Sequence, residues 1–268
     1  MKTRSIFTFK GAPLVALIVT SGLSAVGFIW PFIVSENQGH PQWIFLIAAP
    51  CSLLILFSSI SSKELDSKSI ALLAVLSAII AALRPMGTGA VGIEPMWFVL
   101  ILSARVFGPS FGFMLGTISI FLSAILTGGL GPWVSYQCFA AGWIGLGVAL
   151  IPRTLRGKSE IFALALYGVF AAEFFGIAMD LQFWPWTLGE GTQLSYVAGA
   201  SIASNASNFF TYHFLSAMAW DIPRAIFTAS LIAITGKSVL HTLRRAHTKA
   251  AFLTPIEFIE RAKVQEAK

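Results

Sequence analysis

Several ionisable side chains lie within long apolar stretches of the sequence. Asp221 and Arg224 are three residues apart, which lets them pair on one face of a helix, and we interpret them as a structural ion pair near the cytoplasmic half of a span. Glu173 and Asp180 are seven residues apart and also share one face, so they could form a proton or cation relay. Ionisable groups inside a membrane span usually face the bundle interior or a cavity. Both pairs are therefore expected to face inward.

No motif of a known catalytic centre accompanies these groups. The sequence contains no HExxH motif, no Cys/His cluster and no GxxxxGK[ST] phosphate-binding loop. Cys51 and Cys138 lie inside apolar segments and provide neither a disulfide framework nor a metal-ligand spacing. We therefore expect no enzyme activity, no cofactor and no metal, and any ATP hydrolysis would have to come from other chains.

The composition indicates that the lipid bilayer surrounds this chain. Of the 268 residues 56% are hydrophobic and 11% are charged, whereas a soluble domain carries about 25% charged residues. The 23 Phe and 8 Trp residues are too many for a water-exposed surface to hide. The net charge of +6 agrees with the basic cytoplasmic bias of membrane proteins, so we expect no nucleic-acid partner.

The hydrophobic runs predict an all-α protein with eight spans, since a transmembrane helix needs roughly 20 apolar residues. The first run is longer than a signal-peptide core and is expected to be retained. The stretch 84–96 is either an outer loop or part of a site, because irregular backbone at membrane depth must be buried in protein or line a cavity. The expected spans are 12–34, 43–62, 69–83, 91–107, 111–127, 133–151, 161–177 and 209–235.

The distribution of Lys and Arg predicts the orientation in a cell membrane. Basic residues concentrate before the first span, near 63–68, at 153–158 and in the tail, whereas the opposite side carries Glu36, Glu94, Asp180 and Glu190. By the positive-inside rule both termini are expected in the cytoplasm. The tail 238–268 mixes basic and apolar residues, as a membrane-surface amphipathic helix does.

Small residues repeat at four-residue steps in two spans. Ala74, Ala78 and Ala82 form a smooth stripe that another helix can approach closely, either within this chain or from a partner. Gly108, Gly112 and Gly116 form a similar stripe in the fifth span, which we interpret as packing inside the bundle.

Aromatic and amide side chains near the outer ends of the later spans are candidates for ligand contact. Gly and Pro at 128–132 set Trp133 at the mouth of a helix that also carries Gln137 and Trp143. An amide and an indole facing an outer cavity would suit an aromatic or heterocyclic ligand, although tryptophans also anchor helices at the interface. Three further candidates lie in or after the outer connection that begins near residue 180, namely Trp186, Asn208 and Tyr212.

Four segments resemble a known family. ARVFGPSFGFMLG, LTGGLGPWVSYQCFAAGWIGLGVALIP, SAMAWDIPRA and ITGKSVLHTLRRA are similar to the substrate-specific S subunits of energy-coupling-factor (ECF) transporters, most of all those of actinobacteria, over about 69–252. The resemblance implies a six-helix bundle with both termini in the cytoplasm. The chain would then comprise a two-helix transmembrane extension (1–66), a substrate-binding membrane domain (67–237) and the basic amphipathic tail (238–268).

The resemblance also implies a vitamin importer. The subunit would capture a vitamin outside, rotate on a transmembrane coupling subunit that slides along Ala74, Ala78 and Ala82, and release the vitamin inward when two partner ATPases act. Cobalamin or a precursor is the first expected substrate, and a thiamine-type pyrimidine or another small heterocycle is the next. The family builds its site on the outer side, which by position includes Trp133, Gln137, Trp143, Trp186, Asn208 and Tyr212.

Two other functions fit the sequence. An ion-coupled secondary transporter of a small organic solute would use Glu173, Asp180 and Asp221 as its relay and would need no ATPase partner. A membrane scaffold would bind no ligand at all.

Overall fold

The computed structural model describes residues 5–33, 47, 50–51, 66–87, 91–189 and 191–249. Every regular element in these ranges is a helix, and six helices are long and apolar enough to cross a membrane, which confirms the predicted all-α membrane fold. The expected span at 43–62 lies almost wholly outside the described residues. The elements are α1 (Gly11–Ile33), α3 (Ser67–Leu83), η2 (Arg84–Gly87), α4 (Met96–Phe107), α5 (Pro109–Leu126), α6 (Trp133–Gly147), η3 (Val148–Leu150), α7 (Gly157–Thr187), α8 (Ile202–Ser216) and α9 (Met218–Lys249).

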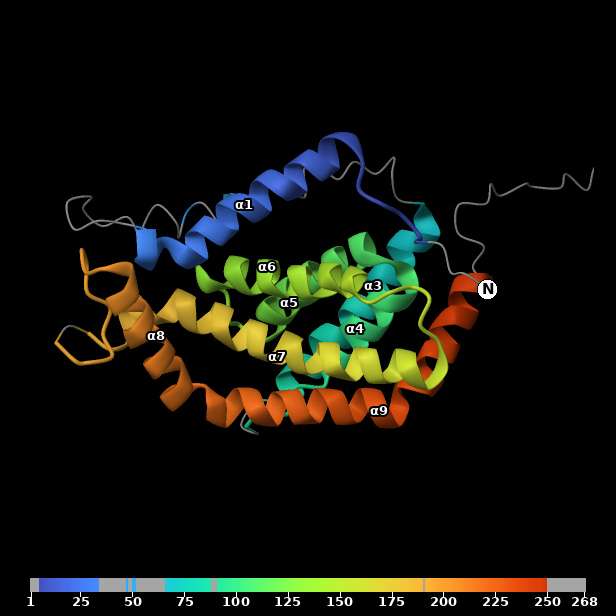
Figure 1. The fold of residues 1–268 in the computed structure, drawn as a ribbon. Helices are drawn as coiled ribbons and strands as arrows, with labels where there is room; N and C mark the ends of the chain where they lie inside the picture. Colours follow the sequence, from blue (N-terminus) through green and yellow to red (C-terminus); the bar gives the residue numbers. More distant parts are fainter. Residues whose placement is uncertain are drawn as a thin grey trace, which may run out of the picture.

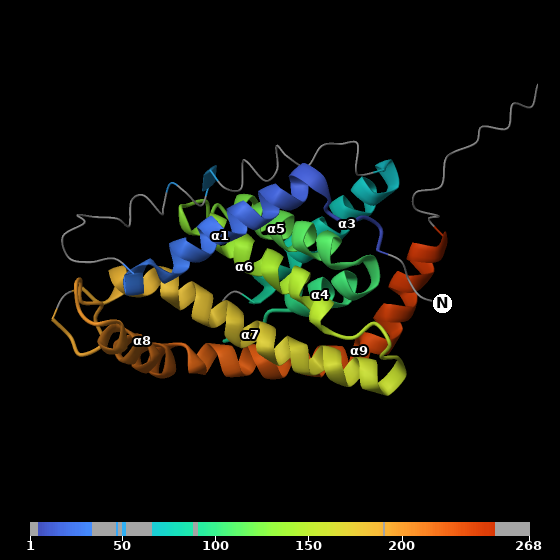
Figure 2. The same ribbon diagram turned by 45° about the horizontal axis from the view of Figure 1, so that its top comes forward.

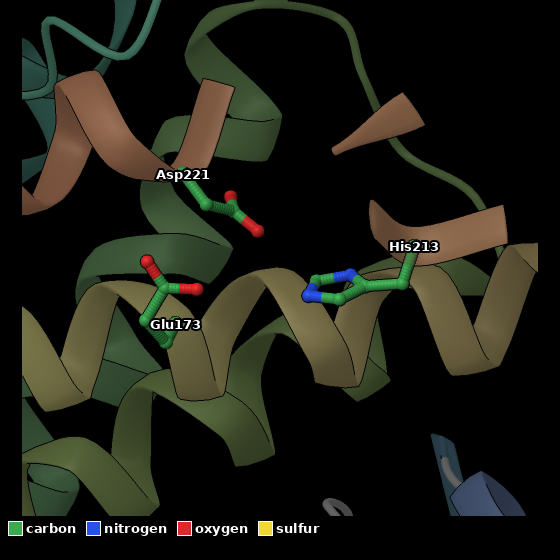
Figure 3. Close-up of side chains that lie close together, drawn as sticks. All are labelled: Glu173, His213 and Asp221. Carbon is green, nitrogen blue, oxygen red and sulfur yellow. The ribbon is translucent and has the colours of Figure 1, made fainter. Parts of the chain in front are cut away.

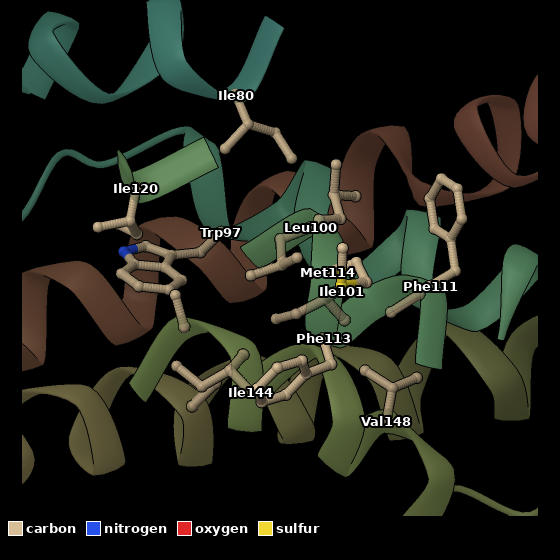
Figure 4. Packing of buried hydrophobic residues seen from close by; sticks show 14 of the residues in the cluster. Ile80, Trp97, Leu100, Ile101, Phe111, Phe113, Met114, Ile120, Ile144 and Val148 are labelled. Atoms are coloured by element: carbon tan, nitrogen blue, oxygen red, sulfur yellow. The ribbon is translucent and has the colours of Figure 1, made fainter. Parts of the chain in front are cut away.

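The short helix α4 lies in the centre of the bundle. It packs against α3, α5, α6, α7 and α9, and its Leu100 and Ile101 have no exposed surface. Figure 4 shows these two side chains between Phe113 and Ile80 of the neighbouring helices. Because protein surrounds it on all sides, a 12-residue helix is sufficient here, although it is too short to span a bilayer alone.

Glycines allow α5 and α6 to pack with their backbones in contact. A Cβ atom added to Gly145 of α6 would lie 2.1 Å from the carbonyl oxygen of Gly112, and one added to Gly116 would lie 2.4 Å from the carbonyl oxygen of Ala141. Helices within a bilayer gain little from hydrophobic association, so close contact between small residues stabilises the pair. The internal packing predicted for the glycine stripe is confirmed at Gly112 and Gly116.

Replacing Gly145 with alanine is therefore expected to destabilise the protein by about 1–3 kcal/mol, the usual effect of overpacking a core. The added methyl group would force α5 and α6 apart. Thermal unfolding in detergent measures the effect, and Gly22→Ala in α1 is the matched control because a Cβ there meets nothing within 4 Å. Equal unfolding midpoints for the two variants would contradict the backbone contact.

The N-terminal segment and α1 pack against the rest of the bundle rather than standing apart, and α1 contacts α6, α7 and α8. The N–H of Ile6 donates to the carbonyl oxygen of Phe107 (3.0 Å), at the junction where Gly108 adopts φ +107° and separates α4 from α5. From there α1 runs along the bundle toward α8 (Figures 1 and 2). Its Phe28 contacts Tyr136 and Trp143 of α6, with ring centroids 4.9 and 5.6 Å apart.

The last expected span, 209–235, is instead two helices that meet at Ala217. The N–H of Ala217 caps α8 by donating to the carbonyl oxygen of His213 (2.8 Å), and α9 starts at the next residue. Pro223 has no N–H with which to continue a helical ladder, which favours a new start shortly before it. α7 also differs from the expected span 161–177, since it continues to Thr187 and includes Asp180.

Candidate ligand-binding site

A cavity of about 410 Å³ opens at one end of the bundle, which we call the α8 end. Here α3, α5 and α7 finish and α4, α6 and α9 begin. A concave site that combines aromatic walls with a few convergent polar groups is the usual form of a small-molecule pocket. Its lining residues are Arg84, Pro85, Gly87, Glu94, Trp97, Ser123, Thr127, Gln137, Phe175 and Trp220.

Arg84 and Gln137 form one polar side of this cavity. Nη2 of Arg84 donates to Oε1 of Gln137 (2.9 Å), and Nη1 lies 3.5 Å from the hydroxyl oxygen of Ser123. These side chains come from η2, α6 and α5, so the contacts tie three elements together. Bonded in this way, the guanidinium and the amide are held in place before any ligand arrives.

Glu94 forms the opposite polar side and accepts three hydrogen bonds. The indole N–H groups of Trp97 and Trp220 donate to its two carboxylate oxygens at 2.5 and 3.1 Å, and Nη2 of Arg224 donates at 3.2 Å. Glu94 lies in the turn before α4, outside the spans. Burial there would raise the pKa of its carboxyl, but the Arg224 guanidinium and the three donated hydrogen bonds hold that pKa below its ordinary value. Glu94 therefore remains ionised at neutral pH.

A glycine turn brings Glu94 against α9. Gly92 has φ +68°, and a Cβ there would lie 2.5 Å from backbone atoms of Trp220 and Arg224. Only glycine combines this left-handed conformation with so close an approach.

Arg224 links the Glu94 side of the cavity to α7 and α9. Its Nη1 donates to Oδ1 of Asp221 (2.5 Å), and its guanidinium carbon lies 5.5 Å from the ring centroid of Phe175. Phe175 also packs on Trp97, with centroids 4.5 Å apart. The arginine thus positions both the carboxylate of Glu94 and an aromatic wall.

A comparison with protein-family models identifies the protein's family. Residues 65–245, more than half of the chain, match the model for the ECF-type riboflavin transporter, S component. The chain belongs to this family. It is thus the substrate-binding subunit of an ECF transporter, and the family partners with ECF membrane and ATPase subunits. No curated protein and no solved structure matches the chain significantly.

The structure brings one of the six candidate ligand residues of this S component into the cavity, namely Gln137. Trp143 is on the same helix but faces α1, where its indole N–H donates to Oγ of Ser21 (3.1 Å). Six residues correspond to roughly 240° around a helix, so these two side chains cannot share a face. In the structure, Gln137 thus faces the cavity and Trp143 faces α1.

The other four candidates lie outside the lining of this cavity. Trp133 is 37% exposed at the start of α6, and Trp186 is 41% exposed near Trp30 of α1. Asn208 donates through Nδ2 to the carbonyl oxygen of Ser195 (3.1 Å). Tyr212 packs in a separate aromatic cluster with Trp184 and Phe209.

Asp221 and Arg224, which the sequence predicts to pair on one helix face, do form an ion pair. They lie in the first two turns of α9, at the α8 end and beside the cavity. The break at Ala217 turns the middle of the expected span into the start of a new helix, which places the pair there.

Sequence reasoning missed most of the cavity lining. The available signal is the stretch 84–96, which the sequence predicts to be an outer loop or part of a site and which supplies Arg84 and Glu94. Trp97 and Phe175 had no such signal, because both lie in uniformly apolar runs. Their role depends on which helices meet at the cavity.

The run GPSFG at 108–112 has the GxSxG spacing of a hydrolase nucleophile. Its Ser110 is 4% exposed in the first turn of α5 and accepts a hydrogen bond from the N–H of Phe9 (3.2 Å). A helix precedes it rather than a strand, so the context of that motif is missing.

The alanine stripe of α3 points away from the rest of the bundle. Ala74, Ala78 and Ala82 are exposed, whereas Leu76 and Ile80 of the same helix are buried against α4 and α5. Among the described helices none covers the stripe.

Proposed function

We propose that this S component binds riboflavin, or a closely related planar heterocyclic vitamin, in the cavity at the α8 end. The observation that carries the proposal is the combination of Trp97, Phe175 and Trp220 with the polar pairs at Glu94 and Arg84 in one cavity. The family's description supplies the vitamin, and the chemistry of the cavity agrees with it.

The lining complements a flavin in both shape and polarity. A flat three-ring system presents large faces that aromatic side chains stack against. One edge of that ring system alternates carbonyl and N–H groups, which match the guanidinium donors of Arg84 and the amide of Gln137. The Glu94 carboxylate has lone pairs beyond those bonded to the indoles and can accept from ligand hydroxyl groups.

The size of the cavity favours a flavin over cobalamin. At about 410 Å³ it lies near the lower end of small-molecule pockets. A corrin macrocycle with its side chains is several times bulkier than a flavin and would require the bundle to open. A thiamine-type pyrimidine would fit by volume but would leave part of the aromatic wall uncovered.

We further propose that the α8 end faces outward and both termini face the cytoplasm. Arg105, Arg153, Arg156 and Arg244 gather at the opposite end, around Glu160 and the connection before α7, as the positive-inside rule requires of a cytoplasmic face. The exposed alanine stripe of α3 would contact the coupling subunit, and two ATPases on other chains would drive release.

A fluorescence titration tests the substrate. The full-length protein, purified in detergent without partners or ATP, is expected to bind one equivalent of riboflavin with a Kd of about 1 μM or tighter, seen as quenching of both flavin and tryptophan emission. Thiamine and cyanocobalamin titrated in parallel should give no saturable signal. Tight binding of either in place of riboflavin would overturn the substrate assignment.

An ion-coupled transporter remains the second candidate, because Glu173, Asp180 and Asp221 lie near one another around His213. It predicts that proteoliposomes containing this chain alone accumulate riboflavin when a proton or sodium gradient is applied. The proposed S component should show no such uptake until the coupling and ATPase subunits are added.

A further inference from the structure

A second polar cluster lies where α7, α8 and α9 meet, separate from the lining of the cavity. It contains Glu173 of α7, His213 of α8 and Asp221 of α9, and one ligand atom from each lies within 4.8 Å of the others. Figure 3 shows the imidazole ring of His213 directed toward the two carboxylates. One imidazole and two carboxylates form a donor set typical of a divalent transition-metal ion.

A fourth residue orients the imidazole as metal sites commonly do. Oδ2 of Asp180 lies 2.7 Å from Nδ1 of His213, and the two side chains are 19% and 8% exposed. When Nδ1–H donates to this carboxylate, Nε2 keeps its lone pair free for a metal ion. The same hydrogen bond fixes the orientation of the ring.

Asp221 supplies an independent sign of a missing partner. The residue is 2% exposed, and its Oδ1 accepts from Arg224, but its buried Oδ2 has no hydrogen-bond partner. A buried carboxylate oxygen without a partner is unfavourable and is rare in folded proteins. Gly176 leaves the space for this carboxylate, since a Cβ there would overlap it.

The local charge balance also favours a cation. Glu173, Asp180 and Asp221 place three carboxylates around one imidazole, and the nearby Arg224 is shared between Asp221 and Glu94. Buried carboxylates need paired positive charge. A dication bound by the cluster would supply it.

We propose that Glu173, His213 and Asp221 bind a divalent transition-metal ion of the Zn²⁺ type, with Asp180 holding the imidazole in position. Water would complete a tetrahedral shell around the ion. The ion would hold the end of α8 and the start of α9 against α7. Through Asp221 it would also fix Arg224, and with it the Glu94 side of the cavity.

A zinc titration tests this site without reference to any vitamin. The full-length protein is stripped with EDTA, exchanged into metal-free buffer and titrated with Zn²⁺ by calorimetry, and thermal unfolding is then measured with and without Zn²⁺. One equivalent should bind and should raise the unfolding midpoint by a few degrees, because the ion binds the folded state. Wild-type protein with no stoichiometric binding, or with an unchanged midpoint, would overturn the proposal.

Three variants distinguish binding at this site from non-specific binding of zinc at the protein surface. Glu173→Gln and His213→Gln should each weaken binding at least tenfold, whereas His241→Gln, on the exposed side of α9, should bind as the wild type does. Should His213→Gln fail to fold, the half-buried Glu173→Gln decides the matter. Zinc binding that survives Glu173→Gln unchanged, or that is lost in His241→Gln, refutes the site. Because no variant is read by riboflavin binding, this result is independent of the proposed substrate.

Discussion

Glu94→Ala is expected to weaken riboflavin binding by about a hundredfold, because the change removes the shared acceptor of two indoles and a guanidinium. A hydrogen bond to a charged group is worth about 1.5–3 kcal/mol, and about 1.4 kcal/mol corresponds to a tenfold change in Kd. Without the carboxylate, Trp97 and Trp220 lose the contact that orients their rings, and Arg224 keeps only Asp221 as a carboxylate partner among the described contacts. The fluorescence titration with riboflavin measures the change.

Two further variants show whether the effect belongs to the site or to the fold. Glu94→Gln keeps one acceptor oxygen, so a smaller loss of about tenfold is expected. Glu160→Ala removes another buried carboxylate at the opposite end, where Arg105 and Arg244 each lie 2.7 Å from it. This control should lower the unfolding midpoint while leaving the Kd for riboflavin unchanged. Equal affinity in Glu94→Ala and wild type would show that the ligand does not bind in this cavity.

The class of protein and most of its helices could be predicted from the sequence because lipid imposes simple rules. A run of about 20 apolar residues can only be a helix when it spans a bilayer, since its backbone must satisfy its own hydrogen bonds. The stripe of Ala74, Ala78 and Ala82 could also be identified from the sequence, because three residues at four-residue steps share a helix face.

Hydropathy could not reveal where helices break or which faces meet. The break at Ala217 falls inside a continuous apolar run, so nothing in the average hydrophobicity marks it. Gln137 was found because a polar side chain in an apolar helix is conspicuous, whereas Phe175 and Trp97 resemble any core residue. The cluster of Glu173, His213 and Asp221 joins three helices, and its assembly depends on the angle between α8 and α9. Such contacts follow from tertiary packing alone.

The two ends of the bundle differ in a way that suits a transport cycle. At the α8 end Arg224 is shared between Asp221 and Glu94. The first two turns of α9 therefore position both a candidate ion site and a wall of the cavity. At the other end Glu160 is held by arginines from α4 and α9. Between these fixed ends, the exposed face of α3 offers a smooth apolar surface along the whole helix. The proposed function thus assigns substrate capture and partner contact to different sides of the molecule.

Ala78→Trp is accordingly expected to abolish ATP-dependent uptake while leaving riboflavin binding intact. The stripe allows a partner backbone to approach closely, and an indole in its centre would hold the two helices apart. Uptake by the full complex in proteoliposomes should fall at least about tenfold, and the Kd of the isolated subunit should stay within about twofold, well under the 1.4 kcal/mol of a tenfold change. Ala233→Trp on the exposed face of α9 is the matched control and should retain uptake. If instead Ala233→Trp stops transport and Ala78→Trp does not, the coupling subunit contacts α9, and the alanine stripe faces lipid.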